Sequence, residues 1–263
     1  MCSYIEIFGL TVSMYWLSSI VGLIFAILLA LLRRRNISFH TSAGDIFFTI
    51  LCCMIGALIG AKVFQLTGYI IRDGANNSFW TFENWRGMLS GVGVFYGGLV
   101  GGIAGALIYI HICKLDIWDV SDILVPSVPL FHAFGRLGCF FAGCCYGREA
   151  AWGITFTNSL NAPNGIPLIP VQLFEAGFNL LFLIIILIIR PERKRPKILL
   201  PIYLIMYAVG RFIFEFFRGD IGRGVFLLSV SQWISLLIIP VGIILLIWTT
   251  SANGHGTVKN AGI

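Results

Sequence analysis

Long apolar segments, separated by short polar ones, run along most of the 263-residue chain. A transmembrane α-helix needs roughly 20 mostly apolar residues to cross the hydrocarbon core of a bilayer. Seven segments reach or approach that length, at residues 13–32, 45–71, 93–112, 121–141, 171–189, 198–217 and 227–248. The fourth has the weakest pattern, because Pro126 and Pro129 interrupt it and Arg136 lies inside it. The pattern predicts an all-α membrane protein with seven transmembrane helices, forming a single multi-pass domain over residues 1–263.

Composition supports this interpretation. Only 11% of the residues are charged, whereas soluble domains carry about 25%. Hydrophobic residues make up 58% of the chain, and the mean hydropathy is +0.91. We therefore expect a protein that resides in a membrane.

The lysines and arginines predict the orientation, because cytoplasmic loops are enriched in them. One side of the predicted membrane holds ten basic residues, concentrated in the loops at 33–35 and 190–197, and the other holds five. This bias places the N-terminus outside and the C-terminus in the cytoplasm, with a polar cavity in the outer half of the membrane. The net charge of +6 then reflects topology, and no nucleic-acid partner is expected.

Polar residues inside the predicted spans suggest that cavity. An ionisable group in hydrocarbon is costly and usually faces a partner or a water-filled space. With the predicted orientation, all the candidates fall in the outer half of the membrane. They are Lys62, Tyr96, Arg136, Gln172, Glu175, Arg211 and Glu215, with Arg218 just beyond the sixth span and Ser229, Ser231 and Gln232 at the start of the seventh.

Each of these residues also has a structural interpretation. Arg211 and Glu215 are four residues apart and could form an ion pair on one helix face. Lys62 could extend its ammonium group to the interface, and Tyr96 could belong to the interfacial aromatic belt. Glu175 could interact favourably with the N-terminus of its own helix.

Arg136 lies in the motif GRLG, and no acidic residue is close to it in the sequence. A guanidinium binds phosphate or carboxylate oxygens in a bidentate manner, so a ligand phosphate is the expected partner. The run YGGLVGG at 96–102 places Gly98 and Gly102 at GxxxG spacing, which is typical of closely packed helices.

Cys139, Cys144 and Cys145 follow Arg136 with the spacing C-x4-C-C, which matches no standard zinc motif. If these residues bound a metal, His132, seven residues before Cys139, would be the candidate for the fourth ligand. A disulfide, a reactive thiol and a small buried apolar side chain are the other interpretations.

Six blocks in order resemble the prolipoprotein diacylglyceryl transferase family. They are GALIGAKVF at 56–64, GVGVFYGGLVGG at 91–102, HAFGRLGCFFAGCCYG at 132–147, IPVQLFEA at 169–176, GRFIFEFFRGD at 210–220 and LSVSQWISL at 228–236. The resemblance implies a bacterial plasma-membrane enzyme with seven spans. It would transfer the diacylglyceryl group of phosphatidylglycerol to the lipobox cysteine of a prolipoprotein and release glycerol phosphate. No metal or other cofactor is implied, and the expected partners are phosphatidylglycerol, membrane lipid and the prolipoprotein signal-peptide region.

The resemblance also assigns roles. Arg136 would bind the donor phosphate, Arg211 would stabilise the departing glycerol phosphate, and Glu215 would orient Arg211. Tyr96 occupies the place of a proposed catalytic base and completes the catalytic set. The substrate-binding set is Tyr15, Lys62, Gly98, Gly147, Gln172, Glu175 and Arg218.

This sequence departs from the family pattern at four positions. Tyr96 stands where a histidine is common, and a phenol is a weaker base than an imidazole at neutral pH. Cys139, Ala142 and Cys144 stand where asparagines and an acid are common. These differences leave open another acceptor or transferred group, such as phosphoglycerol moved to a surface polymer. A lipid or anion transporter and a thiol-based redox protein are further alternatives.

Overall fold

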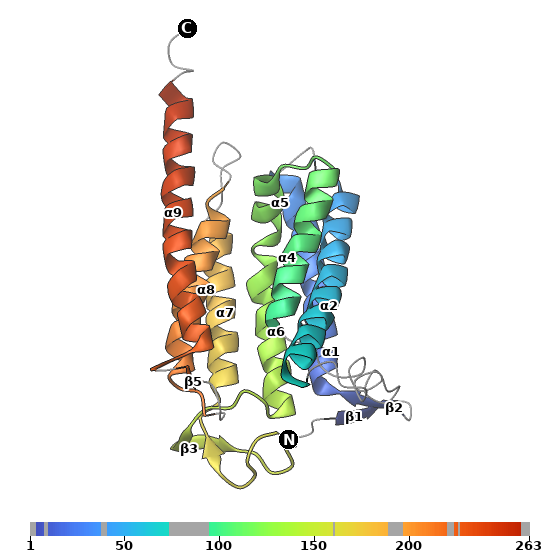
Figure 1. Ribbon diagram of the computed structural model, residues 1–263, viewed down its shortest axis with the longest axis vertical. Coiled ribbons are helices and arrows are strands. Elements are labelled where there is room, and N and C mark those ends of the chain that lie inside the picture. Colours follow the sequence, from blue (N-terminus) through green and yellow to red (C-terminus); the bar gives the residue numbers. More distant parts are fainter. Residues whose placement is uncertain are drawn as a thin grey trace. The chain divides into compact units, whose positions relative to one another are not determined.

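The computed structural model describes residues 4–7, 10–37, 41–73, 95–159, 161–188, 197–219, 224–225 and 227–258 (Figure 1). Most of these residues are helical. The helices are α1 (Met14–Ile37), α2 (Ala43–Asp73), α4 (Phe95–Ile112), α5 (Ile117–Leu124), α6 (Ser127–Ala142), α7 (Val171–Ile188), α8 (Leu199–Glu215) and α9 (Val230–Val258). Within the described residues, three two-stranded antiparallel sheets pair β1 (Tyr4–Ile7) with β2 (Leu10–Ser13), β3 (Glu149–Thr155) with β4 (Pro167–Leu168), and β5 (Gly224–Val225) with β6 (Leu228–Ser229).

Among the described residues, five segments are helical, long and apolar enough to cross a membrane. They are Met14–Arg34, Ala43–Ile71, Ile117–Ala142, Val171–Ile188 and Val230–Ser251, and a shorter apolar helix covers Tyr96–Ile112. The prediction of a helical membrane protein is confirmed at this level. The number of seven spans and their orientation stay predictions.

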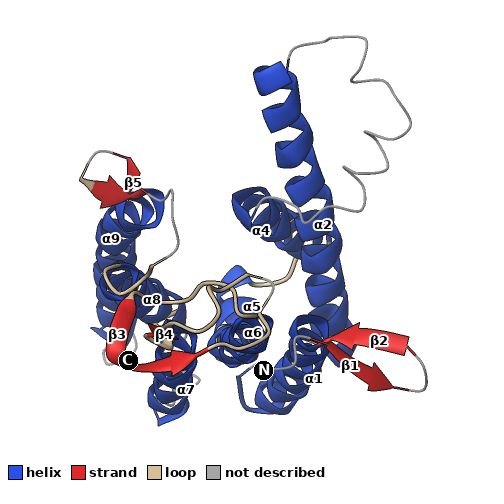
Figure 2. Cartoon of the chain, turned by 90° about the horizontal axis from the view of Figure 1, so that it is seen from below, coloured by secondary structure: helices blue, strands red, loops and turns tan. Residues whose placement is uncertain are grey.

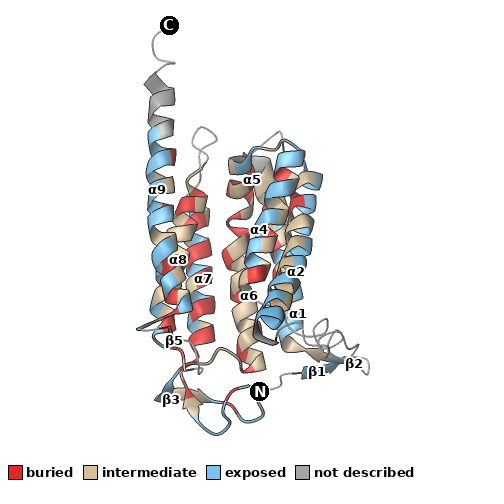
Figure 3. Ribbon diagram, in the orientation of Figure 1, coloured by how far each residue is buried: buried red, intermediate tan, exposed pale blue. Residues whose placement is uncertain are grey.

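The helices expose large apolar side chains. Leu58 on α2 is 68% exposed, and Leu237 and Ile244 on α9 are 71% and 64% exposed. Exposed residues follow much of both helices in Figure 3. Apolar surface on this scale would be unfavourable in water, so these faces are suited to lipid.

Packing divides the chain into two compact units, Met1–Ser38 with Ser121–Ile263, and Phe39–Val120. In the first unit, α6 lies between α1 and α7, and α8 packs along α9 (Figure 2). In the second unit, α2 packs along α4. The organisation of residues 1–263 as a single domain stays a prediction.

The fourth predicted segment is two helices. α5 ends at Leu124 and α6 begins at Ser127, so the chain breaks at Pro126, as the two prolines suggested. Pro129 lies in the first turn of α6, where its missing N–H costs no helical hydrogen bond. The short α6 that results carries Arg136 and Cys139 near its C-terminal end.

The glycines of the second unit allow α2 and α4 to approach closely. A Cβ on Gly60 would lie 2.8 Å from the Gly101 Cα, and one on Gly101 would overlap the Gly56 carbonyl. At Gly98 the space is wider, since a Cβ would lie 3.5 Å from the Ala57 carbonyl oxygen. The predicted close packing is confirmed, but Gly101 makes a closer approach than Gly98.

Candidate active site

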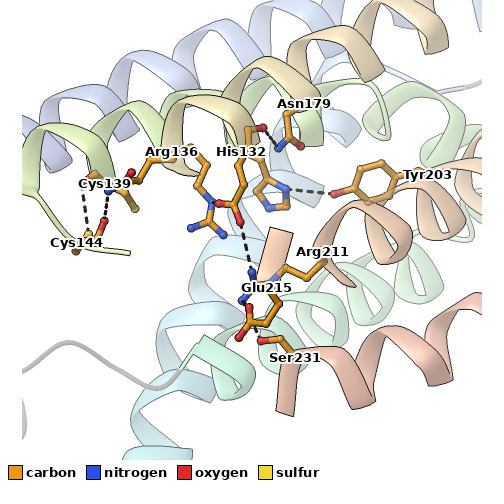
Figure 4. Close-up of polar contacts among 11 residues, drawn as sticks. His132, Arg136, Cys139, Cys144, Asn179, Tyr203, Arg211, Glu215 and Ser231 are labelled. Atoms are coloured by element: carbon orange, nitrogen blue, oxygen red, sulfur yellow. Dashed lines mark hydrogen bonds and ion pairs between the residues drawn. The ribbon is translucent and has the colours of Figure 1, made fainter. Parts of the chain in front are cut away.

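Four charged residues from three helices form one ion-pair network in the first unit (Figure 4). Arg136 on α6 places its Nε 2.6 Å from Oε2 of Glu175 on α7. The other Glu175 oxygen, Oε1, lies 3.4 Å from Arg211 Nη1, and Arg211 Nη2 lies 2.7 Å from Glu215 Oε2. Arg211 and Glu215 are both on α8, so the predicted i, i+4 pair is confirmed. Each carboxylate offsets charge on a neighbouring guanidinium, which lowers the cost of burying all four groups.

Glu175 is a charge partner of Arg136 that the sequence did not indicate, and the binding of a ligand phosphate by Arg136 stays a prediction. The sequence has no acid near Arg136, so a ligand oxygen was expected to balance its charge. The structure instead supplies Glu175 from the neighbouring helix. The Arg136 side chain is 23% exposed and is the most exposed of the network. The Arg211 side chain is 13% exposed and the Glu175 side chain 6%. Arg136 is therefore the member best placed to meet a ligand.

Neighbouring polar groups hold the network in place. Arg211 Nη2 donates to Ser231 Oγ of α9 at 3.0 Å, and Asn179 Nδ2 donates to the Glu175 backbone oxygen at 2.7 Å. Sequence reasoning assigned no role to Asn179, although its signal was present. It is an amide in an apolar segment, one helical turn after a carboxylate.

The segment after α6 is anchored to the ends of two other helices. Gly147 forms an antiparallel bridge with Arg218, and Arg148 N donates to the Phe217 oxygen at 2.9 Å. A Cβ on Gly147 would lie 2.6 Å from the Ile169 oxygen, so only glycine fits without a shift. Gly147 therefore has a packing role, and its substrate-binding role stays a prediction.

Gln172, at the start of α7, is fully buried and donates from Nε2 to the Cys144 oxygen at 2.8 Å. This bond ties the cysteine segment to α7. Tyr15, at the start of α1, is 39% exposed. A Cβ on Gly138 of α6 would lie 3.2 Å from the Tyr15 Cα, so Tyr15 borders the turn of α6 that precedes the cysteines.

The thiols of Cys139, Cys144 and Cys145 lie together, with all three Sγ atoms within 4.8 Å of one another. All three are free and partly buried. Hydrogen bonds with the Cys139 and Cys144 thiols, and then the charges of Arg218 and Arg136, lower the pKa of the Cys145 thiol despite its burial. The segment thus places three free thiols near the positive charges of Arg218 and Arg136.

His132 lies outside this thiol group. Its Nδ1 is 3.3 Å from the Tyr203 hydroxyl, and its ring lies 5.5 Å from the ring of Tyr207. Figure 4 shows it facing Tyr203 on α8. The fourth-ligand interpretation of His132 has no support among the residues that the structure describes.

Comparison with known proteins identifies the family. The profile described as prolipoprotein diacylglyceryl transferase matches residues 3–248. The chain belongs to the prolipoprotein diacylglyceryl transferase family. The phosphatidylglycerol–prolipoprotein diacylglyceryl transferase of Clostridium tetani is 37% identical over 243 residues, which cover 90% of this chain and 93% of that protein. The phosphatidylglycerol–prolipoprotein diacylglyceryl transferase 2 of Clostridium perfringens is 34% identical over 242 residues, which cover 91% of this chain and 92% of that protein. The phosphatidylglycerol–prolipoprotein diacylglyceryl transferase of Bordetella parapertussis is 31% identical over 256 residues, which cover 91% of this chain and 92% of that protein.

In this diacylglyceryl transferase family member, the predicted site residues divide between the two units. The first unit holds the ion-pair network, Tyr15, Gly147, Gln172, Arg218 and the three cysteines. Lys62, Tyr96 and Gly98 belong to the second unit, where Lys62 Nζ lies 3.5 Å from Gln65 Oε1. The structure therefore brings together three of the four predicted catalytic residues, and Tyr96 is described only within its own unit.

Proposed function

We propose that this protein transfers the diacylglyceryl group of phosphatidylglycerol to the lipobox cysteine thiol of a prolipoprotein and releases glycerol phosphate. The observation that carries the proposal is the buried network of Arg136, Glu175, Arg211 and Glu215 among apolar helices. Two guanidiniums in a low-dielectric setting are suited to a lipid phosphate. The names of the relatives supply the reaction that such a site would perform.

The reaction displaces a phosphate from carbon. The acceptor sulfur forms a bond to the terminal glyceryl carbon, the bond from that carbon to the phosphate oxygen breaks, and its electron pair stays on glycerol phosphate. Arg136, the most exposed cation of the network, binds the phosphate in the ground state. Arg211 stabilises the negative charge that grows on the leaving oxygen, which is where preorganised positive charge accelerates a reaction most.

The two carboxylates position the arginines. Glu215 and Ser231 fix Arg211 Nη2 from two sides, and Glu175 bridges Arg211 to Arg136. A guanidinium held in this way loses little side-chain freedom when the phosphate binds. Gln172 and Gly147 act on the same site by fixing the segment between α6 and α7.

The proposed setting is the bacterial plasma membrane, with seven spans and the N-terminus outside. The partners are phosphatidylglycerol, surrounding membrane lipid and the signal-peptide region of the prolipoprotein. The bias of lysine and arginine toward one side supports the orientation. The acceptor thiol and the donor headgroup then meet at the outer half of the membrane, where the polar residues are predicted to lie.

A direct assay tests this function. The purified full-length protein in detergent is incubated with labelled phosphatidylglycerol and a synthetic lipobox peptide, and the products are examined by mass spectrometry. We expect a diacylglyceryl–peptide adduct and an equal amount of glycerol phosphate, and no adduct with a matched peptide that carries serine for cysteine. Release of glycerol phosphate to a different acceptor, with no peptide adduct, would overturn the assignment of the acceptor.

A further inference from the structure

The end of helix α6 brings Cys144 back over Cys139. Gly143 has φ of 69°, and its N–H bonds to the Phe140 oxygen at 3.1 Å. The N–H of Cys144 bonds to the Cys139 oxygen, also at 3.1 Å. This pair of hydrogen bonds is the Schellman motif, which places the residue after the left-handed glycine beside the residue five positions earlier. Cys139 and Cys144 therefore meet because of how the helix ends.

Cys145 joins them through an unusual backbone conformation. Its φ is 59°, in the left-handed region, where residues other than glycine are uncommon. Successive side chains in an extended chain point in opposite directions. Here the Sγ atoms of the successive residues Cys144 and Cys145 lie within 4.8 Å of each other and of the Cys139 Sγ. A left-handed residue costs of order 1–3 kcal/mol and tends to persist at functional sites. The convergence of the sulfurs gives this conformation a purpose.

The sulfur spacing suits a thiophilic metal ion. With a Zn–S distance of about 2.3 Å, three sulfurs around one ion lie roughly 3.8–4.0 Å apart. Sulfurs that are within 4.8 Å of one another therefore need to move by less than about 1 Å each. Three thiolates around Zn²⁺ leave one excess negative charge, and both Arg218 and Arg136 act on Cys145 electrostatically. The surrounding charge is thus complementary to such a centre.

The cluster leaves one coordination position for an external ligand. Among the described residues, the group that could hold a metal contains only these three cysteines, with no histidine or carboxylate. Zinc sites with three protein ligands and an open fourth position are the catalytic type. A thiol that takes the open position loses its proton outright, because the metal stabilises the thiolate.

We propose that Cys139, Cys144 and Cys145 bind Zn²⁺ with an open fourth position, and that the acceptor thiol occupies this position as a thiolate. The second part rests on the proposed function. The acceptor R–SH binds the zinc and releases its proton to solvent. Its sulfur then forms the bond to the glyceryl carbon as the bond from that carbon to the phosphate oxygen breaks. Glycerol phosphate leaves with the electron pair, and the thioether product, a weaker ligand than a thiolate, dissociates.

Metal binding is tested without activity. The full-length protein is purified in detergent, stripped with a chelator and titrated with Zn²⁺ alone, and bound zinc is counted and its ligands determined by X-ray absorption. We expect one zinc per chain with three sulfurs at about 2.3 Å. Cys144→Ser and Cys145→Ser should each weaken affinity by roughly 100-fold or more, since even outer-shell changes cost about 10–100-fold. Cys113→Ser, at an exposed free cysteine beyond α4, should bind zinc normally.

Two results would overturn the zinc site. One is a stripped protein that binds no zinc, or binds it equally well in the Cys144→Ser variant. The other is a disulfide between two of the three cysteines in protein purified without reductant, detected by mass and by blocked alkylation, that persists during the zinc titration. That second result would assign the cluster a redox role.

Adding the acceptor peptide tests the open position. Without phosphatidylglycerol, the cysteine peptide should raise the zinc–sulfur count from three to four, and the serine peptide should leave it at three. An unchanged count would overturn the role of the fourth position. Zinc binding with no transfer to the peptide would overturn the proposed function alone. Transfer at an undiminished rate by the zinc-free Cys145→Ser variant would overturn the zinc mechanism and keep the function.

Discussion

At the scale of single residues, Glu175 is the member of the network that links all the others. Its two oxygens contact Arg136 at 2.6 Å and Arg211 at 3.4 Å, so the two guanidiniums are held on opposite sides of one carboxylate. A helix-start carboxylate is one interpretation of its sequence position, but the structure makes it a bridge between α6 and α8. Both guanidiniums therefore lie beside one carboxylate, and this is the pair of cations that the proposed function assigns to the donor phosphate.

The first prediction concerns this bridge. Glu175→Gln keeps the shape of the side chain but leaves Arg136 and Arg211 with a single carboxylate, Glu215. We expect a loss of roughly 3–5 kcal/mol in the free energy of unfolding, the usual cost of breaking a buried ion pair. Thermal unfolding in detergent would show this as a lower midpoint. Glu149→Gln, at an exposed position of β3, is the matched control and should leave the midpoint unchanged.

The second prediction concerns Arg136. Arg136→Ala should lower kcat/KM for peptide lipidation by roughly 10–100-fold, because losing a charge-assisted contact to the donor phosphate costs about 1.5–3 kcal/mol. Arg136→Lys should recover only part of the loss, because an ammonium lacks the bidentate fork. Arg148→Ala, at an exposed neighbouring arginine, serves as the control. A folded Arg136→Ala protein with normal kcat/KM would remove this residue from the mechanism.

At the scale of elements, the glycine-lined contact between α2 and α4 determines the second unit. Without a hydrophobic driving force inside a bilayer, helices associate through close packing, which small residues permit. Gly60 and Gly101 lie at this contact, and no larger residue fits at either position without a backbone shift. Lys62 is on α2 and Tyr96 is on α4. The packing of the two helices therefore sets the backbone positions of these two residues relative to each other.

The third prediction tests that packing. Gly60→Ala should destabilise the protein by about 1–3 kcal/mol, the cost of overpacking, because its Cβ would lie 2.8 Å from the Gly101 Cα. Gly68→Ala on the same helix has no atom within 4 Å of the added Cβ. That control should be neutral or slightly stabilising, since alanine favours a helix over glycine. Equal midpoints of thermal unfolding for the two variants would contradict the packing argument.

At the scale of the whole molecule, function depends on which side of the membrane the site faces. The ion-pair network and the cysteine cluster lie toward the ends of α6, α7 and α8 that the charge bias predicts to face outward, and this orientation stays a prediction. The charge bias rests on Arg33, Arg34 and Arg35, which the structure places at the C-terminal end of α1 and not in a loop, and on the basic residues at 190–197, of which only Lys197 lies within the described residues. A site on the outer side can receive a prolipoprotein after its export.

The fourth prediction follows from this orientation. With the C-terminus in the cytoplasm, a C-terminal alkaline phosphatase fusion should be inactive and a C-terminal fluorescent protein should fluoresce. An N-terminal reporter should show the opposite pattern, because seven spans place the termini on different sides. An active C-terminal phosphatase would contradict the orientation and, with it, the outer location of the site.

The sequence by itself determined the features that depend on neighbours along the chain. The apolar segments, the break at Pro126 and the Arg211–Glu215 pair follow from hydropathy, from a missing N–H and from the 3.6-residue period of a helix. The order of motifs was also enough to indicate the family. Each of these features needs only local information, so no knowledge of packing is required.

Only the tertiary structure decided which distant residues meet. Glu175 reaches Arg136 because α6 and α7 pack side by side, and no spacing in the sequence encodes that distance. The three cysteines converge because Gly143 ends the helix in a left-handed conformation and Cys145 adopts one as well. The C-x4-C-C spacing in the sequence matches no standard zinc motif, although the three sulfurs lie close together in the folded chain. A site is a set of distances in space, and the folding of the chain is what sets them.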